Sequence, residues 1–133
     1  VSFNFSFSGI KSHCNNLVHN EHQRGNEINK QDLARSFQDC VTSHLVDKTK
    51  KALLKYNLKT LLISGGVSSN SYIRESLKEM CDSIGVTMYM PPKKYCTDNA
   101  AMIGAAAYIL YKDGAFAPLS TNAKSNVQLT NIK

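Results

Sequence analysis

The stretch that decides the fold is Leu61-Leu62-Ile63-Ser64-Gly65-Gly66-Val67-Ser68-Ser69-Asn70. Apolar, strand-compatible residues run into two glycines, and short polar side chains follow where the next helix should begin. Glycine lets the backbone turn sharply and approach a ligand closely, because it has no Cβ. The stretch therefore predicts a strand, a tight turn and a helix start that together form a cradle for a phosphate or nucleotide.

The two glycines also have a plainer interpretation as an ordinary tight turn. The stretch is neither the six-residue glycine fingerprint of dinucleotide-binding folds nor the lysine-containing P-loop. The pattern alone is a weak indication of nucleotide binding, so both interpretations stay open at this point.

Apolar residues repeat every three or four positions on either side of this stretch, which predicts helices. A short amphipathic helix is expected after Gly9, a polar loop over residues 21–30, and the longest helix over residues 30–56 with Asn29 as its N-cap. The helix that follows the glycines should end at Gly85.

Strands are predicted at three places. Phe3, Phe5 and Phe7 alternate with polar residues, a period of two that indicates a half-buried strand ended by Gly9. Further strands are expected over residues 60–64 and 86–90. The alternation of strand and helix from residue 60 onward is an α/β pattern.

A last helix is predicted from Ala100 to Tyr111, and it is apolar nearly all round. Such a helix is typical of a buried position against a neighbour. Its length of about twelve residues falls short of the ~20 needed to cross a bilayer, so we expect a soluble protein.

Composition narrows the class of protein further. The chain has 133 residues, of which 42% are hydrophobic and 20% charged, enough for a packed core. Its four cysteines are widely spread, so neither a zinc finger nor a disulfide framework is indicated. The net charge of +6 favours polyanionic partners, although a lysine-rich helix face such as residues 48–55 is more often simply solvated.

Thr97-Asp98-Asn99 precedes the last helix and has two interpretations. Thr97 or Asp98 can cap the helix, since a short polar side chain satisfies free N–H groups there and a carboxylate favours the helix dipole. Alternatively, Asp98 is a metal or substrate ligand at the end of the strand layer. Spacing alone leaves both open.

Four segments in order resemble the motifs of the tRNA N6-adenosine threonylcarbamoyltransferase family, formerly called O-sialoglycoprotein endopeptidases or the glycoprotease family. They are Phe5-Ser6-Phe7-Ser8-Gly9-Ile10-Lys11-Ser12, Ser36-Phe37-Gln38-Asp39, Ser64 to Asn70 with Ile73-Arg74, and Cys96-Thr97-Asp98-Asn99-Ala100-Ala101-Met102-Ile103. The resemblance covers nearly the whole chain, and the tail from Gly114 is most similar to bacterial members.

The resemblance implies an α/β, actin-like ATPase fold of the sugar-kinase and heat-shock-chaperone kind, with a mixed sheet and packed helices. Residues 1–112 would be a partial C-terminal lobe of a two-lobed protein, and residues 113–133 a C-terminal tail. The nucleotide would lie in the cleft between the lobes.

The resemblance also implies an activity and its site. Family members transfer a threonylcarbamoyl group from threonylcarbamoyl-AMP to N6 of the adenosine beside the anticodon, in tRNAs that read codons beginning with A. Carried over by motif, Gly65, Gly66 and Asn70 contact the nucleotide, and Asp98 is a metal ligand. No catalytic nucleophile is implied.

One divalent metal ion, iron or zinc, is implied as cofactor. The family completes this site with a His-x-x-x-His pair that this sequence lacks, so we expect the chain by itself to be inactive. Implied partners are tRNA, an adenine nucleotide, a related dimerising subunit and a small ATPase, without a membrane. The implied location is the cytoplasm, or the mitochondrial matrix for an organellar member.

Other classes of function remain open on the sequence. The same fold could serve as a nucleotide-binding regulatory or chaperone-like lobe without transferase activity. The sequence offers no set of catalytic residues for the older protease assignment, since no well-placed histidine accompanies Ser6, Ser8 or Cys96.

Overall fold

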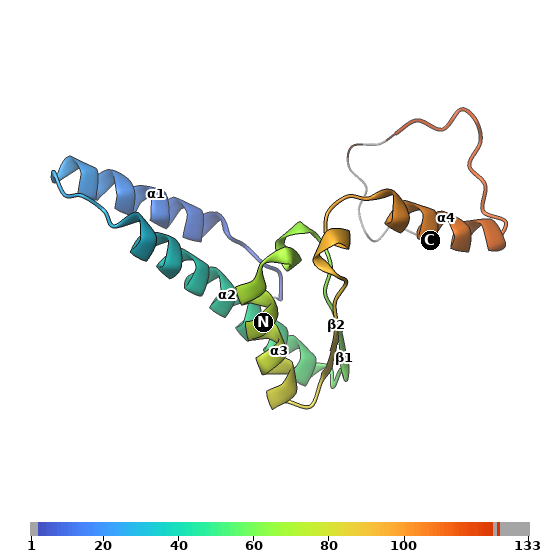
Figure 1. Cartoon of the computed structure of the whole chain (residues 1–133), viewed down its shortest axis with the longest axis horizontal. Coiled ribbons are helices and arrows are strands. Elements are labelled where there is room, and N and C mark those ends of the chain that lie inside the picture. Colours follow the sequence, from blue (N-terminus) through green and yellow to red (C-terminus); the bar gives the residue numbers. More distant parts are fainter. Residues whose placement is uncertain (1–2, 124, 126–133) are drawn as a thin grey trace. The chain divides into compact units, whose positions relative to one another are not determined.

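The computed structural model describes residues 3–123 and residue 125. They fall into two compact units, Val1–Thr97 and Asp98–Lys133, each of which is described by itself. The elements in order are α1 (Ser8–Gln23), α2 (Lys30–Lys55), β1 (Thr60–Leu62), the 3₁₀ turn η1 (Gly66–Ser69), α3 (Ser71–Ser83), β2 (Thr87–Tyr89), the 3₁₀ turn η2 (Lys93–Tyr95) and α4 (Ala100–Lys112) (Figure 1). The expected α/β class is confirmed.

Helices α1 and α2 lie side by side and are joined by a short polar loop (Figure 1). The Asn29 side chain accepts hydrogen bonds from the backbone N–H groups of Gln31 and Asp32, which confirms the predicted N-cap of α2. The predicted loop is wrong in its first residues, because α1 continues through Gln23 and only residues 24–29 connect the helices.

Strands β1 and β2 form a parallel pair joined through η1 and α3. Leu61 lies opposite Met88, and both side chains are half-buried toward the helices. Their neighbours Leu62 and Tyr89 point the other way and are exposed. The strands are shorter than predicted, but their places and types are confirmed.

The core of the first unit lies between the second half of α2, one face of α3 and the two strands. Its buried side chains are Leu53, Ile73, Leu77, Met80, Cys81 and Val86. Four of these six come from α3, so this helix carries most of the burial.

Gly85 ends α3 as predicted. Its φ of +68° is left-handed, and the N–H of Val86 bonds the carbonyl of Cys81 at 2.9 Å, which is the Schellman arrangement. The chain thereby reverses at once into β2.

The predicted strand at the N-terminus is wrong. Residues 3–7 have no regular structure, and Gly9 lies in the first turn of α1 rather than at a strand end. The rings of Phe5 and Phe7 do lie on one side, stacked with centroids 6.1 Å apart, and both meet His44 edge-on. The only ladder among the described residues joins β1 and β2, so residues 3–7 pair with no strand despite their alternating pattern.

Helix α4 is present as predicted, but its expected burial is wrong. Every residue from Ala100 to Lys112 is exposed. A largely apolar helix with an exposed surface is typical of an element that another surface covers in the working protein.

Two expectations about organisation remain. The predicted tail over residues 113–133 lies partly outside the described residues, and the boundary after residue 112 stays a prediction. Within the described ranges, no helix combines the length and apolar character needed to cross a membrane.

Candidate functional site

The glycine turn directly follows β1 at its carboxyl end. Gly65 has φ +91° and ψ 164°, a region of backbone space that is essentially restricted to glycine. Gly66 then begins η1, a single turn of 3₁₀ helix, and Asn70 connects this turn to α3. The sequence prediction of strand, tight turn and helix start is confirmed.

Ser68 holds the turn closed from inside. Its side chain is buried, and its hydroxyl donates to the carbonyl oxygen of Gly65 at 2.6 Å. The backbone N–H of Ser68 donates to the same oxygen at 3.0 Å. Because two donors bond the same carbonyl oxygen, the backbone of the turn is held in one conformation.

The two glycines are present for different reasons. Gly65 is required by its backbone conformation, although a Cβ there would meet no atom within 4 Å. Gly66 has no positive φ, and a Cβ there would make only an ordinary contact of 4.0 Å with Cγ2 of Thr97. Neither conformation nor packing among the described residues requires glycine at position 66.

Asn70 is the N-cap of α3. Its Oδ1 accepts hydrogen bonds from the backbone N–H groups of Tyr72 at 2.9 Å and Ile73 at 3.2 Å. The cap uses the carbonyl end of the side chain, so Nδ2 is the atom through which Asn70 could donate to a ligand.

An apolar groove of about 890 Å³ borders the turn within the first unit. It runs along α1 and α2, with Phe7, Leu33 and Phe37 among its lining residues, and reaches Val67, Asn70 and Ile73. Lys11 and Lys30 add positive charge to its lining. Such a groove can hold a flat apolar group while its charged residues attract an anion.

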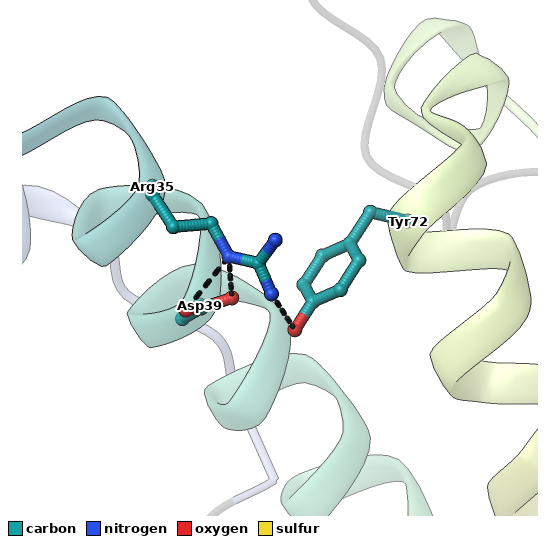
Figure 2. Close-up of polar contacts among 3 residues, drawn as sticks. All are labelled: Arg35, Asp39 and Tyr72. Carbon is teal, nitrogen blue, oxygen red and sulfur yellow. Dashed lines mark hydrogen bonds and ion pairs between the residues drawn. The ribbon is translucent and has the colours of Figure 1, made fainter. Parts of the chain in front are cut away.

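A polar cluster joins α2 to the first turn of α3 (Figure 2). Nε of Arg35 lies 3.0 Å from both carboxylate oxygens of Asp39, and Nη2 donates to the hydroxyl of Tyr72 at 3.4 Å. The Arg35 guanidinium also lies over the Tyr72 ring, 4.8 Å from its centroid. The cluster therefore adds a contact between α2 and α3 on the surface of the first unit, where solvent exposure keeps its contribution small.

The cluster shifts the titration of its members. The Tyr72 hydroxyl, and then the Arg35 guanidinium, lower the pKa of Asp39 below its ordinary value because they stabilise the carboxylate. The same carboxylate raises the pKa of Tyr72, since it accepts the phenol proton in a hydrogen bond. All three side chains belong to the first unit.

The four predicted site residues are divided between the two units. Gly65, Gly66 and Asn70 lie together in the turn, whereas Asp98 is the first residue of the second unit and is exposed. The hydrogen bond that caps α4 comes from Asn99, whose Oδ1 accepts from the N–H of Met102 at 2.9 Å. The cap was expected at Thr97 or Asp98, and that assignment is corrected by one or two residues.

Metal ligands are sparse in this chain. Nowhere in residues 3–123 and 125 do three His, Cys, Asp or Glu side chains gather as a metal ion would need. A single carboxylate fits a shared site but cannot form one, because a cation of this kind takes several ligands. The four cysteines are free thiols.

Sequence patterns gave no role to the Arg35 cluster or to Asn99 as a cap. For Asn99 a signal existed, because asparagine ranks at least as high as threonine and aspartate at the N-cap. For the cluster there was none, since Arg35 and Tyr72 are 37 positions apart in the sequence.

Comparison with known proteins assigns the class. Residues 1–105 match the family model described as tRNA N6-adenosine threonylcarbamoyltransferase. Relatives with that name from Moorella thermoacetica and Halalkalibacterium halodurans are each 45% identical over 128 and 130 residues, which is 96% and 98% of this chain. The relative from Bacillus subtilis is 44% identical over 133 residues, 99% of this chain.

These relatives are transferases by name, and the match extends over nearly all of the chain. The chain belongs to the tRNA N6-adenosine threonylcarbamoyltransferase family, as the motifs in its sequence indicated. It spans 37 to 38% of the length of these relatives.

Alanine substitutions separate the two glycines. We expect Gly65→Ala to lower the free energy of unfolding by about 1–3 kcal/mol, because alanine is strained at φ +91°. Gly66→Ala should change it by no more than about 0.5 kcal/mol, because its backbone and surroundings accept a methyl group. Urea unfolding measures both, and equal losses would contradict the assignment.

The Arg35 cluster predicts a pH dependence. Because its folded-state pKa is lowered, Asp39 stabilises the folded chain above the ordinary carboxyl pKa, and this contribution is lost as the pH falls through the lowered value. Carbon-13 NMR titration of Asp39 should show the lowered pKa in the wild type and a higher one in Tyr72→Phe. An ordinary Asp39 pKa in the wild type would mean that the cluster does not form in solution.

Proposed function

We propose that the complete polypeptide containing this chain transfers the threonylcarbamoyl group from threonylcarbamoyl-AMP to N6 of the adenosine beside the tRNA anticodon. The N6 amine attacks the carbamoyl carbon and loses a proton, AMP leaves, and the products are modified tRNA and AMP. Family membership and the turn at Gly65 and Gly66 support this proposal.

The observation that carries the proposal is Gly66. The fold does not need a glycine there, because a Cβ would make only an ordinary contact with Thr97, and the residue begins the turn that follows β1. A residue without a side chain at such a point suits close approach of a phosphate to backbone N–H groups. In the proposed mechanism Gly65 and Gly66 hold the adenylate, and Nδ2 of Asn70 donates to it.

The apolar groove beside the turn suits the rest of the adenylate. Its walls from α1 and α2 would cover the flat face of the base, while Lys11 and Lys30 favour the negative charge of the phosphate. Catalysis would then consist mostly of positioning and charge stabilisation, with no protein nucleophile.

Asp98 is the proposed metal ligand of this chain. Its exposed carboxylate would supply one oxygen to a divalent ion, iron or zinc, whose other ligands come from the part of the protein outside this chain. When bound, the ion would polarise the carbonyl of the mixed anhydride. The chain by itself should therefore be inactive.

The remaining features of the proposal follow from the family. The fold would be one lobe of an actin-like ATPase, with tRNA bound in part through lysines such as Lys50 and Lys51. A related dimerising subunit and a small ATPase are the proposed partners, in the bacterial cytoplasm. A nucleotide-binding regulatory lobe without transferase activity is the alternative, which the experiments below distinguish.

Substitution of Asp98 tests the transfer reaction. In the complete polypeptide, supplied with threonylcarbamoyl-AMP, its partners and tRNA, we expect Asp98→Ala to lower the rate by at least about a hundredfold, because the ion loses a ligand. Mass spectrometry of nucleosides from digested tRNA measures the product.

Asp113→Ala is the matched control, because Asp113 is also an exposed aspartate and lies just after α4. It should modify tRNA at the wild-type rate. Equal rates for Asp98→Ala and the wild type would refute the metal assignment, and nucleotide binding without any modified nucleoside would favour the regulatory alternative.

Gly66→Ala tests the nucleotide turn without disturbing the fold. The added methyl group should block approach of the phosphate and weaken AMP binding by about tenfold or more, measured by calorimetry on the complete polypeptide. The small effect expected on unfolding makes this variant informative. Unchanged AMP affinity would show that the phosphate does not approach Gly66.

A further inference from the structure

Arg74 lies in the first turn of α3, and the proposed mechanism gives it no role. Its half-buried guanidinium donates to three acceptors in three different segments. Nε donates to the carbonyl oxygen of Ser68, and Nη2 donates to the carbonyl of Pro91 at 2.7 Å and lies 2.9 Å from Sγ of Cys96. One side chain thereby ties the glycine turn to the two segments that follow β2.

These three acceptors belong to parts of the chain without regular pairing. Ser68 sits in η1, Pro91 follows β2, and Cys96 follows η2. Ser68 and Cys96 are each only 5% exposed. Buried polar groups need partners, and one guanidinium bonds all three of these, while the Cys96 thiol also donates to the carbonyls of Pro91 and Pro92.

The geometry of the guanidinium makes this contact specific. Its nitrogen atoms are held in one plane at fixed separations, so it can satisfy several acceptors only when they occupy set positions. A shift of the glycine turn relative to the segment after β2 would break at least one bond. A lysine at position 74 could reach one acceptor but not hold all three.

We propose that Arg74 is the positioning residue of the nucleotide turn. It sets where Gly65 and Gly66 lie relative to the segment after β2, and so determines how well the turn holds the adenylate. The inference rests on the proposed function. In this role Arg74 acts through the turn, because Nε and Nη2 bond Ser68, Pro91 and Cys96.

The test compares Arg74→Met, Arg74→Lys and the control Arg35→Met in the complete polypeptide. Arg35 also bridges to α3 but is exposed and touches neither the turn nor the segment after β2. We expect Arg74→Met to raise KM for threonylcarbamoyl-AMP about tenfold and to leave KM for tRNA within about twofold. Arg74→Lys should be intermediate, and Arg35→Met unchanged in both constants.

A purely structural role for Arg74 gives a different pattern. It lowers the active fraction, so kcat falls while both KM values stay at the wild-type level, and that result would overturn the proposal. If Arg74→Met loses its cooperative unfolding transition, the same comparison is decided on Arg74→Lys.

Failure of this inference is distinguishable from failure of the proposed function. If the wild type modifies no tRNA, the transferase proposal fails, and calorimetry with AMP alone still decides the role of Arg74. Weaker AMP binding by Arg74→Met than by Arg35→Met supports positioning, and equal binding refutes it. If the wild type binds no AMP, both the proposed nucleotide site and the positioning role of Arg74 are refuted.

Discussion

Burial of one face of α3 is the interaction on which the rest of the first unit depends. Its apolar side chains pack against α2 and the two strands, so the helix can be neither rotated nor shifted without exposing Leu77 or Met80. Asn70 fixes where this helix begins, and Gly85 fixes where it ends. The glycine turn and β2 are therefore placed by the length of one helix and its two caps.

Features that depend on neighbouring residues were predictable from the sequence. The long helix α2, its cap at Asn29, the strand before the glycines and the stop at Gly85 all follow from local spacing and backbone preference. Whether residues 3–8 form a strand was not predictable in this way, because a strand also needs a neighbouring strand to pair with. Likewise, the apolar character of α4 was plain, but whether it is covered depends on a surface elsewhere.

The site shows the same division. Residue types identified the turn, and the left-handed backbone at Gly65 agrees with them. The bonds of Arg74 join positions up to 22 residues apart, and no spacing rule in the sequence announces such a contact. The capping role considered for Thr97 and Asp98 belongs to the neighbouring Asn99, and the interpretation of Asp98 as a metal ligand stays a prediction.

The difference between Gly65 and Gly66 has a consequence for how the sequence can drift. The backbone demands the first glycine, whereas only the proposed ligand demands the second. If a gene duplicate kept this fold but its product no longer bound the ligand, selection would retain glycine at position 65 and would allow other residues at position 66. The residue at position 66 would therefore indicate whether a descendant protein still binds the nucleotide.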